Sequence, residues 1–253
     1  MPSPAAVFFD QDGVIIDTER DGHRVAFNMT FKEFGFADVW GVDYYHELLQ
    51  IGGGKERMRH HWQTKGFSRP VAETEIDALI KEMHQRKTEI FVDLIEAGKL
   101  PLRAGVHRFM REAIKVGLKL AVCTTSNERA AKAVTEKMLP DIKFDLVLAG
   151  DVVSKKKPDP EIYLLALSRL GLPAKQAFVV EDSRNGVLAA EGANMHVLVT
   201  TNGYTEQEDL SAGDIIVTCL GDRDGEKGTL RKGDFPFDGV LHVNQVLDQF
   251  SAG

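Results

Sequence analysis

The chain has 253 residues, of which 43% are hydrophobic and 27% charged, and its formal net charge is −7. This composition is typical of one large globular domain, or of a core domain with an insertion. The acidic balance argues against a general nucleic-acid binder, although it leaves an anionic small substrate open. No apolar run is long enough to cross a bilayer, and the N-terminus lacks the pattern of a signal peptide. We therefore expect no nucleic-acid partner and no membrane attachment.

Short apolar runs alternate with helix-like stretches along most of the chain. The predicted strands cover residues 6–9, 118–123, 146–149, 177–180 and 196–199. The predicted helices cover residues 106–116, 128–138, 160–170 and 186–192. Because the strands are apolar throughout, this alternation predicts an α/β fold with a Rossmann-like parallel sheet covered on both faces. The two cysteines, Cys123 and Cys219, form no close metal-binding pair, so we expect reduced, buried thiols.

The stretch from about residue 19 to residue 100 interrupts the alternation. It has helical periodicity over residues 23–34, 73–84 and 86–95 and shows no clear strand. The simplest interpretation is an α-helical cap domain, residues 19–99, inserted into a core formed by residues 1–18 and 100–253. Pro101 and Gly105 mark the return to the core. The polar, glycine-rich tract at residues 221–234 is predicted to be a surface loop.

Polar residues follow several of the predicted strands, and parallel sheets bind ligands at the carboxyl ends of their strands. We expect these residues to converge on one edge; they are Asp10, Thr124, Asp151, Glu181 and Asp182.

The first motif is FFDQDG, in which two aspartates follow an apolar strand. Asp10 can attack phosphorus as a nucleophile, and Asp12 can exchange a proton with the leaving oxygen. Mg²⁺ would relieve the repulsion between the two carboxylates. A solvated acidic turn is the alternative, whereas a calcium loop is excluded by the spacing of the following residues. Gln11 points away from this pair if the strand alternates, and is expected to matter least.

Three further motifs each allow a functional and a structural interpretation. In AVCTTSN, Thr124 and Thr125 can hold a phosphoryl oxygen, or the segment simply caps a helix. In SKKKPDPEIY, Lys157 can neutralise a bound phosphate, or it belongs to a solvated turn, as we expect for Lys155 and Lys156. In FVVEDSRNG, two adjacent acids can ligate a metal, or they cap the next helix.

These four motifs, in this order, resemble the haloacid dehalogenase superfamily of phosphohydrolases, in the subfamily with a helical cap after the first motif. The resemblance implies a phosphoric monoester hydrolase in which Asp10 is the nucleophile and Asp12 the general acid/base. It implies that Thr124 and Lys157 bind the transferring phosphoryl group. The implied Mg²⁺ ligands are the Asp10 carboxylate, the Asp12 carbonyl and the Asp182 carboxylate, with Glu181 acting mainly through water. True dehalogenases of the superfamily lack the second aspartate, so Asp12 argues against that chemistry.

The predicted cap contains the stretch IGGGKERMRHH. Its glycines allow close backbone approach to a ligand, and Lys55 and Arg57 follow at once. Cations on a cap indicate a second anionic group on the substrate. The alternative is a helix start with a solvated basic face, to which Arg59, His60 and His61 are expected to belong.

Together with DTERDGHRVAFN and DVVSKKKPDP, this stretch resembles the CbbY-type phosphatases of photosynthetic organisms, in particular the plant plastid branch. The resemblance implies removal of the 1-phosphate of xylulose-1,5-bisphosphate, an inhibitor of Rubisco, to give xylulose 5-phosphate for the Calvin cycle. It further implies a monomer in the plastid stroma, or otherwise in the cytoplasm; a transit peptide is not visible in this chain.

The same resemblance implies roles for further residues in substrate binding. Glu19 and His23 would face sugar hydroxyls, and Lys87 would point toward a phosphate. The remaining implied substrate contacts are Gly53, Gly54, Lys55, Arg57, Thr125, Ser126 and Asn127. The spacing from Asp10 to His23 is one residue longer than in many relatives, and we expect Gly22 to absorb the insertion.

Three alternatives remain open from the sequence. One is a phosphosugar mutase like β-phosphoglucomutase, in which a sugar hydroxyl instead of water accepts the phosphoryl group. Another is a different sugar-phosphate phosphatase of the same superfamily. A third, a catalytically silent binding protein on the same scaffold, is disfavoured by the intact set of acids and Lys157.

Overall fold

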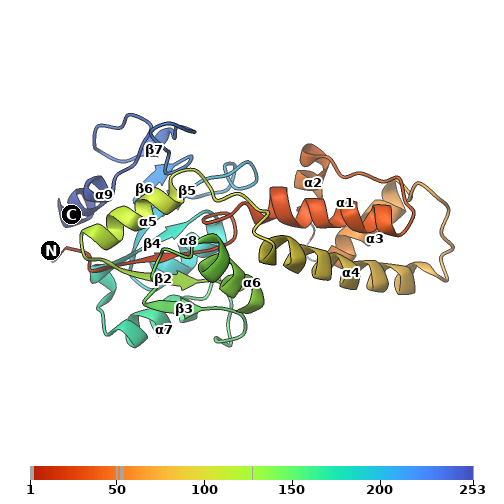
Figure 1. The fold of residues 1–253 in the computed structure, drawn as a ribbon, viewed down its shortest axis with the longest axis horizontal. Coiled ribbons are helices and arrows are strands. Elements are labelled where there is room, and N and C mark those ends of the chain that lie inside the picture. Colours follow the sequence, from red (N-terminus) through yellow and green to blue (C-terminus); the bar gives the residue numbers. More distant parts are fainter. Residues whose placement is uncertain (1–2, 50, 52–53, 127, 253) are drawn as a thin grey trace. The chain divides into compact units, whose positions relative to one another are not determined.

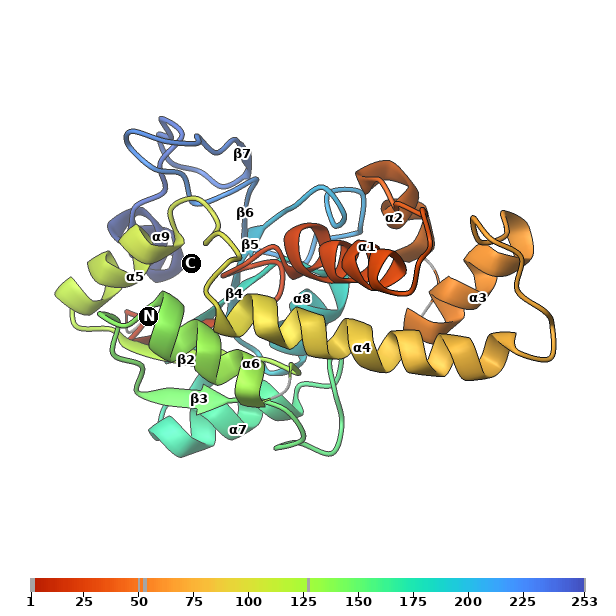
Figure 2. The same cartoon turned by 45° about the vertical axis from the view of Figure 1, so that its right-hand side comes forward.

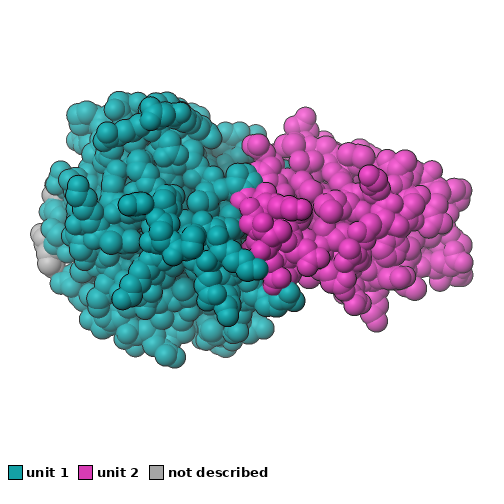
Figure 3. Space-filling model, in the orientation of Figure 1, with its two compact units in different colours: residues 1–17, 101–253 teal, residues 18–100 magenta. Residues whose placement is uncertain are grey.

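The chain forms two compact units, shown in Figures 1, 2 and 3. The computed structural model describes residues 3–49, 51, 54–126 and 128–252. The sheet unit consists of Met1–Asp17 and Pro101–Gly253, and the helical unit of Thr18–Leu100.

The sheet unit is built on a seven-stranded sheet in the order β3-β2-β1-β4-β5-β6-β7. All neighbouring strands are parallel except β6 and β7, which are antiparallel. The strands are β1 Ala6–Phe9, β2 Lys119–Cys123, β3 Leu146–Leu148, β4 Ala177–Glu181, β5 His196–Thr200, β6 Ile215–Val217 and β7 Leu230–Lys232. The predicted Rossmann-like α/β fold class is confirmed.

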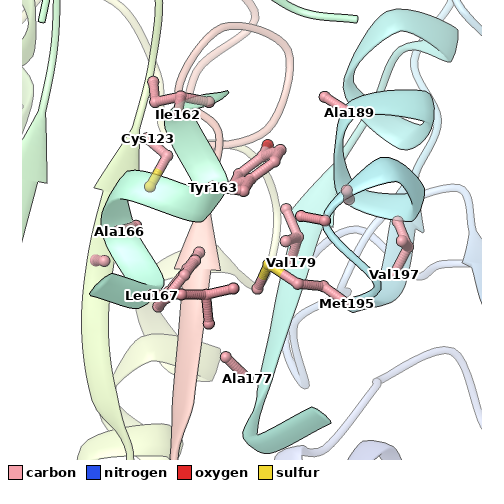
Figure 4. Close-up of a cluster of buried hydrophobic side chains, with 14 of the residues drawn as sticks. Cys123, Ile162, Tyr163, Ala166, Leu167, Ala177, Val179, Ala189, Met195 and Val197 are labelled. Carbon is pink, nitrogen blue, oxygen red and sulfur yellow. The ribbon is translucent and has the colours of Figure 1, made fainter. Parts of the chain in front are cut away.

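Helices cover both faces of this sheet, which explains why its strands are apolar on both sides. The helices are α5 Val106–Lys115, α6 Glu128–Ala133, α7 Glu161–Leu170, α8 Arg184–Gly192 and α9 Val243–Ala252, with a short 3₁₀ helix at Ala174–Gln176. On one face, α7 and α8 pack against alternate strand residues, as Figure 4 shows. On the other face, Phe109 of α5 contacts Phe9, and Phe250 of α9 contacts Phe178.

The strand order places the switch point of the sheet between β1 and β4. From β1 the chain continues outward through β2 to β3, and it then returns to β4 on the other side of β1. Ligands of open α/β sheets bind at the carboxyl ends of the strands that flank such a point. Asp10 directly follows β1, and Glu181 ends β4.

The sheet unit differs from the prediction in three places. The predicted helix 128–138 is α6 followed by a π-helix, Val134–Met138. The tract 221–234 is not entirely a loop, because it contains β7, which pairs with β6. Strands β6 and β7 and helix α9 were not predicted; each strand has only three residues, and the sequence of β7, LRK, lacks an apolar pattern.

The helical unit contains only helices among its described elements. They are a π-helix at Thr18–His23, α1 Arg24–Glu33, α2 Val42–Leu49, α3 Gly54–Thr64 and α4 Ile76–Glu96. Helical periodicity was predicted over 73–84 and 86–95, and one continuous helix, α4, covers most of the first range and all of the second. Gln85, which separates the two ranges, is not a helix breaker and lies exposed on α4.

The helical unit starts with a π-helix, Thr18–His23, where the extra residue expected before His23 could be held. A π-helical turn holds one more residue than an α-helical turn. Gly22 lies buried within it, and a Cβ atom there would come within 2.8 Å of the Phe91 ring. A larger residue at position 22 would therefore push the π-helix away from α4.

Aromatic side chains form the core of the helical unit. Phe27 and Phe31 of α1 pack against Trp40, with ring centroids 4.6 and 4.9 Å away. His61 lies buried beside them and joins Tyr44 Oη, 2.9 Å from its Nδ1, to Asp38 Oδ1, 3.1 Å from its Nε2. The sequence analysis placed His61 on a solvated basic face. This prediction is wrong, because His61 is a buried core residue. In the described part of the chain, no helix combines the length and the apolar character needed to cross a membrane.

Candidate active site

Three buried carboxylates gather at the switch point of the sheet. Asp10, Glu181 and Asp182 each offer an oxygen atom that lies within 4.8 Å of the others. They meet because β1 and β4 are neighbours, and the backbone N–H of Asp10 donates to the carbonyl of Val180 over 3.0 Å. Burial, opposed by Lys157 and reinforced by the charges of Glu181 and Asp12, raises the pKa of Asp10 to about 7. Burial also raises the pKa of Asp182 well above its usual range.

Lys157 supplies positive charge to this cluster. Its Nζ atom lies 2.5 Å from Asp10 Oδ1, 2.7 Å from Glu181 Oε1 and 3.1 Å from the carbonyl oxygen of Cys123. Burial opposes its charge, but Asp10 and Glu181 outweigh that effect and raise the pKa of Lys157 well above its ordinary value. The lysine is therefore a buried, permanent ammonium group, which excludes the solvated-turn interpretation.

The one positive charge of Lys157 does not balance the negative charge of three buried carboxylates. The cluster therefore has the composition of a site for a hard divalent cation. Carboxylate oxygens are the ligands that Mg²⁺ prefers. The residues present thus fit the metal that the family resemblance implies.

Glu181 is held by partners that the sequence did not reveal. Its Oε1 accepts a hydrogen bond from Tyr163 Oη as well as the one from Lys157, and its Oε2 accepts one from the backbone N–H of Asp182, 3.2 Å away. A Cβ atom at Gly186 would overlap this carboxylate. The Glu181 carboxylate therefore occupies space that is free only because residue 186, near the start of α8, is a glycine.

Asp182 is oriented by Asn202, which follows β5. The side-chain amide of Asn202 donates to Asp182 Oδ2 over 2.7 Å. Arg103 holds the same loop, because its guanidinium donates to the carbonyl oxygens of Thr201, at 2.5 Å, and Gly13. Asn202 follows a predicted strand, a signal that could have found it; nothing in the sequence singled out Arg103 or Tyr163.

Asp12 lies across from the carboxylate cluster and is held by side chains that follow β2. Its Oδ2 accepts hydrogen bonds from Ser126 Oγ and, at 3.5 Å, from Thr124 Oγ1. Thr124 is buried and also accepts a hydrogen bond from the backbone N–H of Ser126 over 3.0 Å. These contacts bring Asp12, Thr124 and Ser126 together. The other oxygen, Asp12 Oδ1, is buried and has no hydrogen-bond partner among the described residues.

The remaining predicted residues of the sheet unit are placed as follows. Thr125 is half-buried, and Asn127 lies outside the described residues. Asp151 does not join the cluster, because its side chain is 92% exposed and pairs with Lys156. Lys155 and Lys156 are solvated, as predicted. Gln11 is fully buried, and its side-chain amide has no hydrogen-bond partner in the described part of the chain.

The helical unit holds a separate polar cluster. Tyr45 Oη donates to Glu19 Oε2 over 2.7 Å and accepts from Arg57 Nη1 at 3.3 Å. Arg57 Nε also donates to the carbonyl of Ile51 over 3.0 Å. The structure thus brings Glu19 and Arg57 together through Tyr45, a residue that the sequence analysis did not single out.

Lys87 and His23 form a second pair in this unit. Lys87 Nζ lies 2.8 Å from His23 Nδ1, and 4.8 and 5.3 Å from the ring centroids of Phe27 and Phe91. Burial lowers the pKa of Lys87 to about 8, with Glu19 opposing and Arg57 assisting. Burial, assisted by Lys87, lowers the pKa of His23 well below its usual value. His23 is therefore neutral, and its Nδ1 accepts a hydrogen bond from the ammonium group of Lys87.

The glycine-rich stretch is described only in part. Gly53 lies outside the described residues, whereas Gly54 begins α3 and a Cβ atom there would come within 2.8 Å of the His84 ring. Lys55 is exposed.

Comparisons with known proteins identify the family. The haloacid dehalogenase-like hydrolase family matches residues 4–194. A CBBY-like protein of Arabidopsis thaliana is 46% identical over 228 residues, which cover 88% of this chain and 72% of that protein.

Two solved structures are similar in fold and sequence. The crystal structure of CbbY from Rhodobacter sphaeroides in complex with phosphate matches with a TM-score of 0.66 and 36% identity, over 85% of this chain and 94% of that one. A mutant of that CbbY in complex with xylulose-(1,5)bisphosphate matches with a TM-score of 0.66 and 35% identity, over the same shares. The resemblance to CbbY proteins is thereby confirmed, and the chain belongs to the haloacid dehalogenase-like hydrolases, as a phosphatase.

Proposed function

We propose that the protein is a Mg²⁺-dependent sugar-bisphosphate phosphatase that removes the 1-phosphate of xylulose-1,5-bisphosphate to give xylulose 5-phosphate. The observation that carries this proposal is the cluster of Asp10, Glu181 and Asp182 around Lys157. The choice of sugar is supported by the similarity to a CbbY that was solved with xylulose-(1,5)bisphosphate.

In the proposed reaction, a carboxylate oxygen of Asp10 attacks phosphorus and forms an aspartyl phosphate. The bond from phosphorus to the sugar oxygen breaks, and Asp12 donates a proton to that oxygen. Asp12 then takes a proton from water, which attacks phosphorus, releases inorganic phosphate and restores the Asp10 carboxylate. Thr124 and Lys157 bind the transferring phosphoryl group throughout.

The metal site we propose consists of the Asp10 carboxylate, the Asp12 carbonyl and the Asp182 carboxylate, with Glu181 acting mainly through water. Bound Mg²⁺ supplies positive charge against the phosphoryl oxygens and against the repulsion of the carboxylates. Asn202 orients Asp182 within this set.

We assign recognition of the second phosphate to the cap domain, residues 19–99, set in a core of residues 1–18 and 100–253. Its candidate cations are Lys55, Arg57 and Lys87. The assignment is best supported for Arg57 and Lys87, because neighbouring side chains hold both of them in place. Glu19 and His23 would bind sugar hydroxyls, and Gly53, Gly54, Thr125, Ser126 and Asn127 would complete the substrate contacts. This division explains how one enzyme can distinguish a bisphosphate from a monophosphate.

A phosphate-release assay over a panel of sugar phosphates tests the substrate, with and without Mg²⁺. We expect xylulose-1,5-bisphosphate to have the highest kcat/KM, and EDTA to abolish turnover. Hydrolysis of ribulose-1,5-bisphosphate at the same rate would contradict the assigned specificity. Formation of glucose 6-phosphate from β-glucose 1-phosphate and a bisphosphate activator would instead identify a mutase.

We further propose, from the family resemblance, that the protein is a monomer. We also propose that it is located in the plastid stroma, or otherwise in the cytoplasm, and the similarity to a plant CBBY-like protein supports the stroma. Light scattering after gel filtration tests the first point. Fractionation of the source cells tests the second.

A further inference from the structure

The side chain of Tyr163 has two parts that meet the active site, since its ring faces Lys157 and its hydroxyl binds Glu181. It lies fully buried on α7, and Figure 4 shows its ring among Cys123, Ile162 and Val179. Its ring centroid is 5.0 Å from Lys157 Nζ, and its hydroxyl donates to Glu181 Oε1. The ring therefore faces the ammonium group of Lys157, while the hydroxyl shares an acceptor with it.

The ammonium group of Lys157 has no donor left over. It carries three N–H bonds, and three acceptors lie within hydrogen-bond distance, namely Asp10 Oδ1, Glu181 Oε1 and the Cys123 carbonyl. To bind a phosphoryl oxygen, Lys157 must therefore release or share one of these bonds.

Of the three acceptors, Glu181 keeps the most hydrogen-bond donors when Lys157 releases it. After that change, Glu181 Oε1 still accepts from the Tyr163 hydroxyl, and Glu181 Oε2 still accepts from the backbone N–H of Asp182. Among the described residues, Lys157 is the side-chain donor to Asp10 Oδ1 and to the Cys123 carbonyl, and neither oxygen has a second one. A buried carboxylate that keeps no donor is strongly destabilised, so the donor that remains on Glu181 Oε1 decides which acceptor Lys157 can release.

We propose that Tyr163 is a positioning residue, whose hydroxyl holds Glu181 in place while one N–H of Lys157 passes from Glu181 to the transferring phosphoryl group. This inference rests on the phosphoryl-binding role proposed above for Lys157. Without the hydroxyl, Glu181 retains its hydrogen bond from Lys157. The phosphoryl group must then compete with the Glu181 carboxylate for that N–H.

The substitution Tyr163→Phe separates the two parts of the side chain, because it keeps the ring and removes the hydroxyl. Calorimetric titration with inorganic phosphate, in the presence of Mg²⁺, measures the step directly. We expect phosphate affinity to fall about tenfold, since a hydrogen bond to a charged group has about that effect on an equilibrium. We expect kcat for p-nitrophenyl phosphate to fall by a similar factor.

Tyr44→Phe is the matched control. It removes a hydroxyl that is 2.9 Å from His61 Nδ1 in the helical unit, so we expect a lower Tm and unchanged phosphate affinity. If Tyr163→Phe also lowers Tm and leaves phosphate affinity unchanged, its hydroxyl has only a structural role and the proposal is wrong. Phosphate affinity can be compared between Tyr163→Phe and wild type without knowing the sugar, so the test remains valid if the substrate assignment is wrong. A wild-type protein that binds no phosphate would overturn both the role of Tyr163 and the proposed function.

A second measurement needs no change at position 163. The chain contains four tyrosines, so labelling each ring at Cζ with ¹³C gives four signals, and Phe variants of Tyr44, Tyr45 and Tyr204 assign the fourth by elimination. We expect the Tyr163 signal to shift when phosphate is added, because its hydroxyl then compensates Glu181 in place of Lys157. A signal that stays in place at saturating phosphate would overturn the proposal.

Discussion

The side-chain amide of Asn202 donates to Asp182 Oδ2 over 2.7 Å, and the loop around it fixes which way that amide faces. Its own Oδ1 accepts from the backbone N–H groups of Tyr204 and Thr205, at 2.9 and 3.1 Å. Turning the amide over would break all three bonds. Asn202 is therefore a fixed donor, and one oxygen of Asp182 is committed to it.

Substituting Asn202 by Ala should weaken the binding of Mg²⁺ about 10- to 100-fold, since groups that orient a metal ligand have effects of this size. The rise of Tm with Mg²⁺ concentration measures the affinity without any substrate. Asn28→Ala is the control, because Asn28 makes two comparable bonds to the backbone of Trp40. It should lower Tm and leave the Mg²⁺ dependence unchanged; equal Mg²⁺ affinity in Asn202→Ala and wild type would show that Asp182 needs no orientation.

Substituting Asp12 by Asn should affect substrates according to their leaving groups. A sugar alkoxide needs a proton as it leaves, and we expect a rate loss of about 10³ for a sugar phosphate. Nitrophenolate leaves without a proton, so the first step with p-nitrophenyl phosphate should persist while the hydrolysis of the aspartyl phosphate is slow. Rapid mixing should then show a burst of nitrophenol equal to the enzyme concentration. Equal slowing of both substrates with no burst would argue against the acid role of Asp12.

Two glycines of α8 should respond in opposite ways to substitution by Ala. A Cβ atom at Gly186 would overlap the Glu181 carboxylate, whereas one at Gly192 would meet the Pro160 side chain at an ordinary 3.4 Å. Gly186→Ala should displace Glu181 and lower both Tm and kcat, with kcat falling about tenfold or more. Gly192→Ala should leave kcat unchanged and raise stability by up to about 0.5 kcal/mol through helix propensity. Similar kcat values for the two variants would mean that the position of Glu181 does not limit catalysis.

The sequence predicts the sheet and the acidic cluster well, because both arise from local patterns. Apolar runs that end in polar residues identify the central strands and, through parallel pairing, bring Asp10 and Asp182 together. The three-residue strands β6 and β7 offer no such pattern. The periodicity over residues 73–84 and 86–95 indicates helix in both ranges, but it does not show that both belong to the single helix α4.

The residues that hold the site were not predictable from local patterns. Tyr163 lies in an apolar helix and looks like an ordinary core residue, and Arg103 looks like a surface cation. Their roles come from contacts with residues at least 18 positions away in the chain, such as Glu181 for Tyr163 and Thr201 for Arg103. A side chain that acts through long-range hydrogen bonds has no signature in the spacing of its neighbours.

The buried ammonium group of Lys87 lowers the free energy of unfolding by an amount that depends on pH. Burial lowers its pKa from 10.5 to about 8, so between pH 8 and 10.5 the unfolded chain holds a proton that the folded chain has released. Stability should therefore rise with pH across this window, and the full cost should be present below pH 8. The titratable and charged groups that face Lys87 are His23, His84, Glu19 and Arg57. Of these, Glu19 alone reduces the cost.

Lys87→Met should therefore stabilise the protein at pH 7 by about 2 kcal/mol, because an apolar side chain of similar length replaces a buried charge between the Phe27 and Phe91 rings. Urea unfolding at a series of pH values measures the difference, which should shrink above pH 8 and vanish near pH 10.5. Lys81→Met, at an exposed position of the same helix, should change neither stability nor its pH dependence. A variant that is less stable at pH 7 than wild type would show that the bond to His23 outweighs the cost of burial. The expected result would instead mean that Lys87 is retained in spite of its cost, as is typical of a residue that binds an anionic substrate.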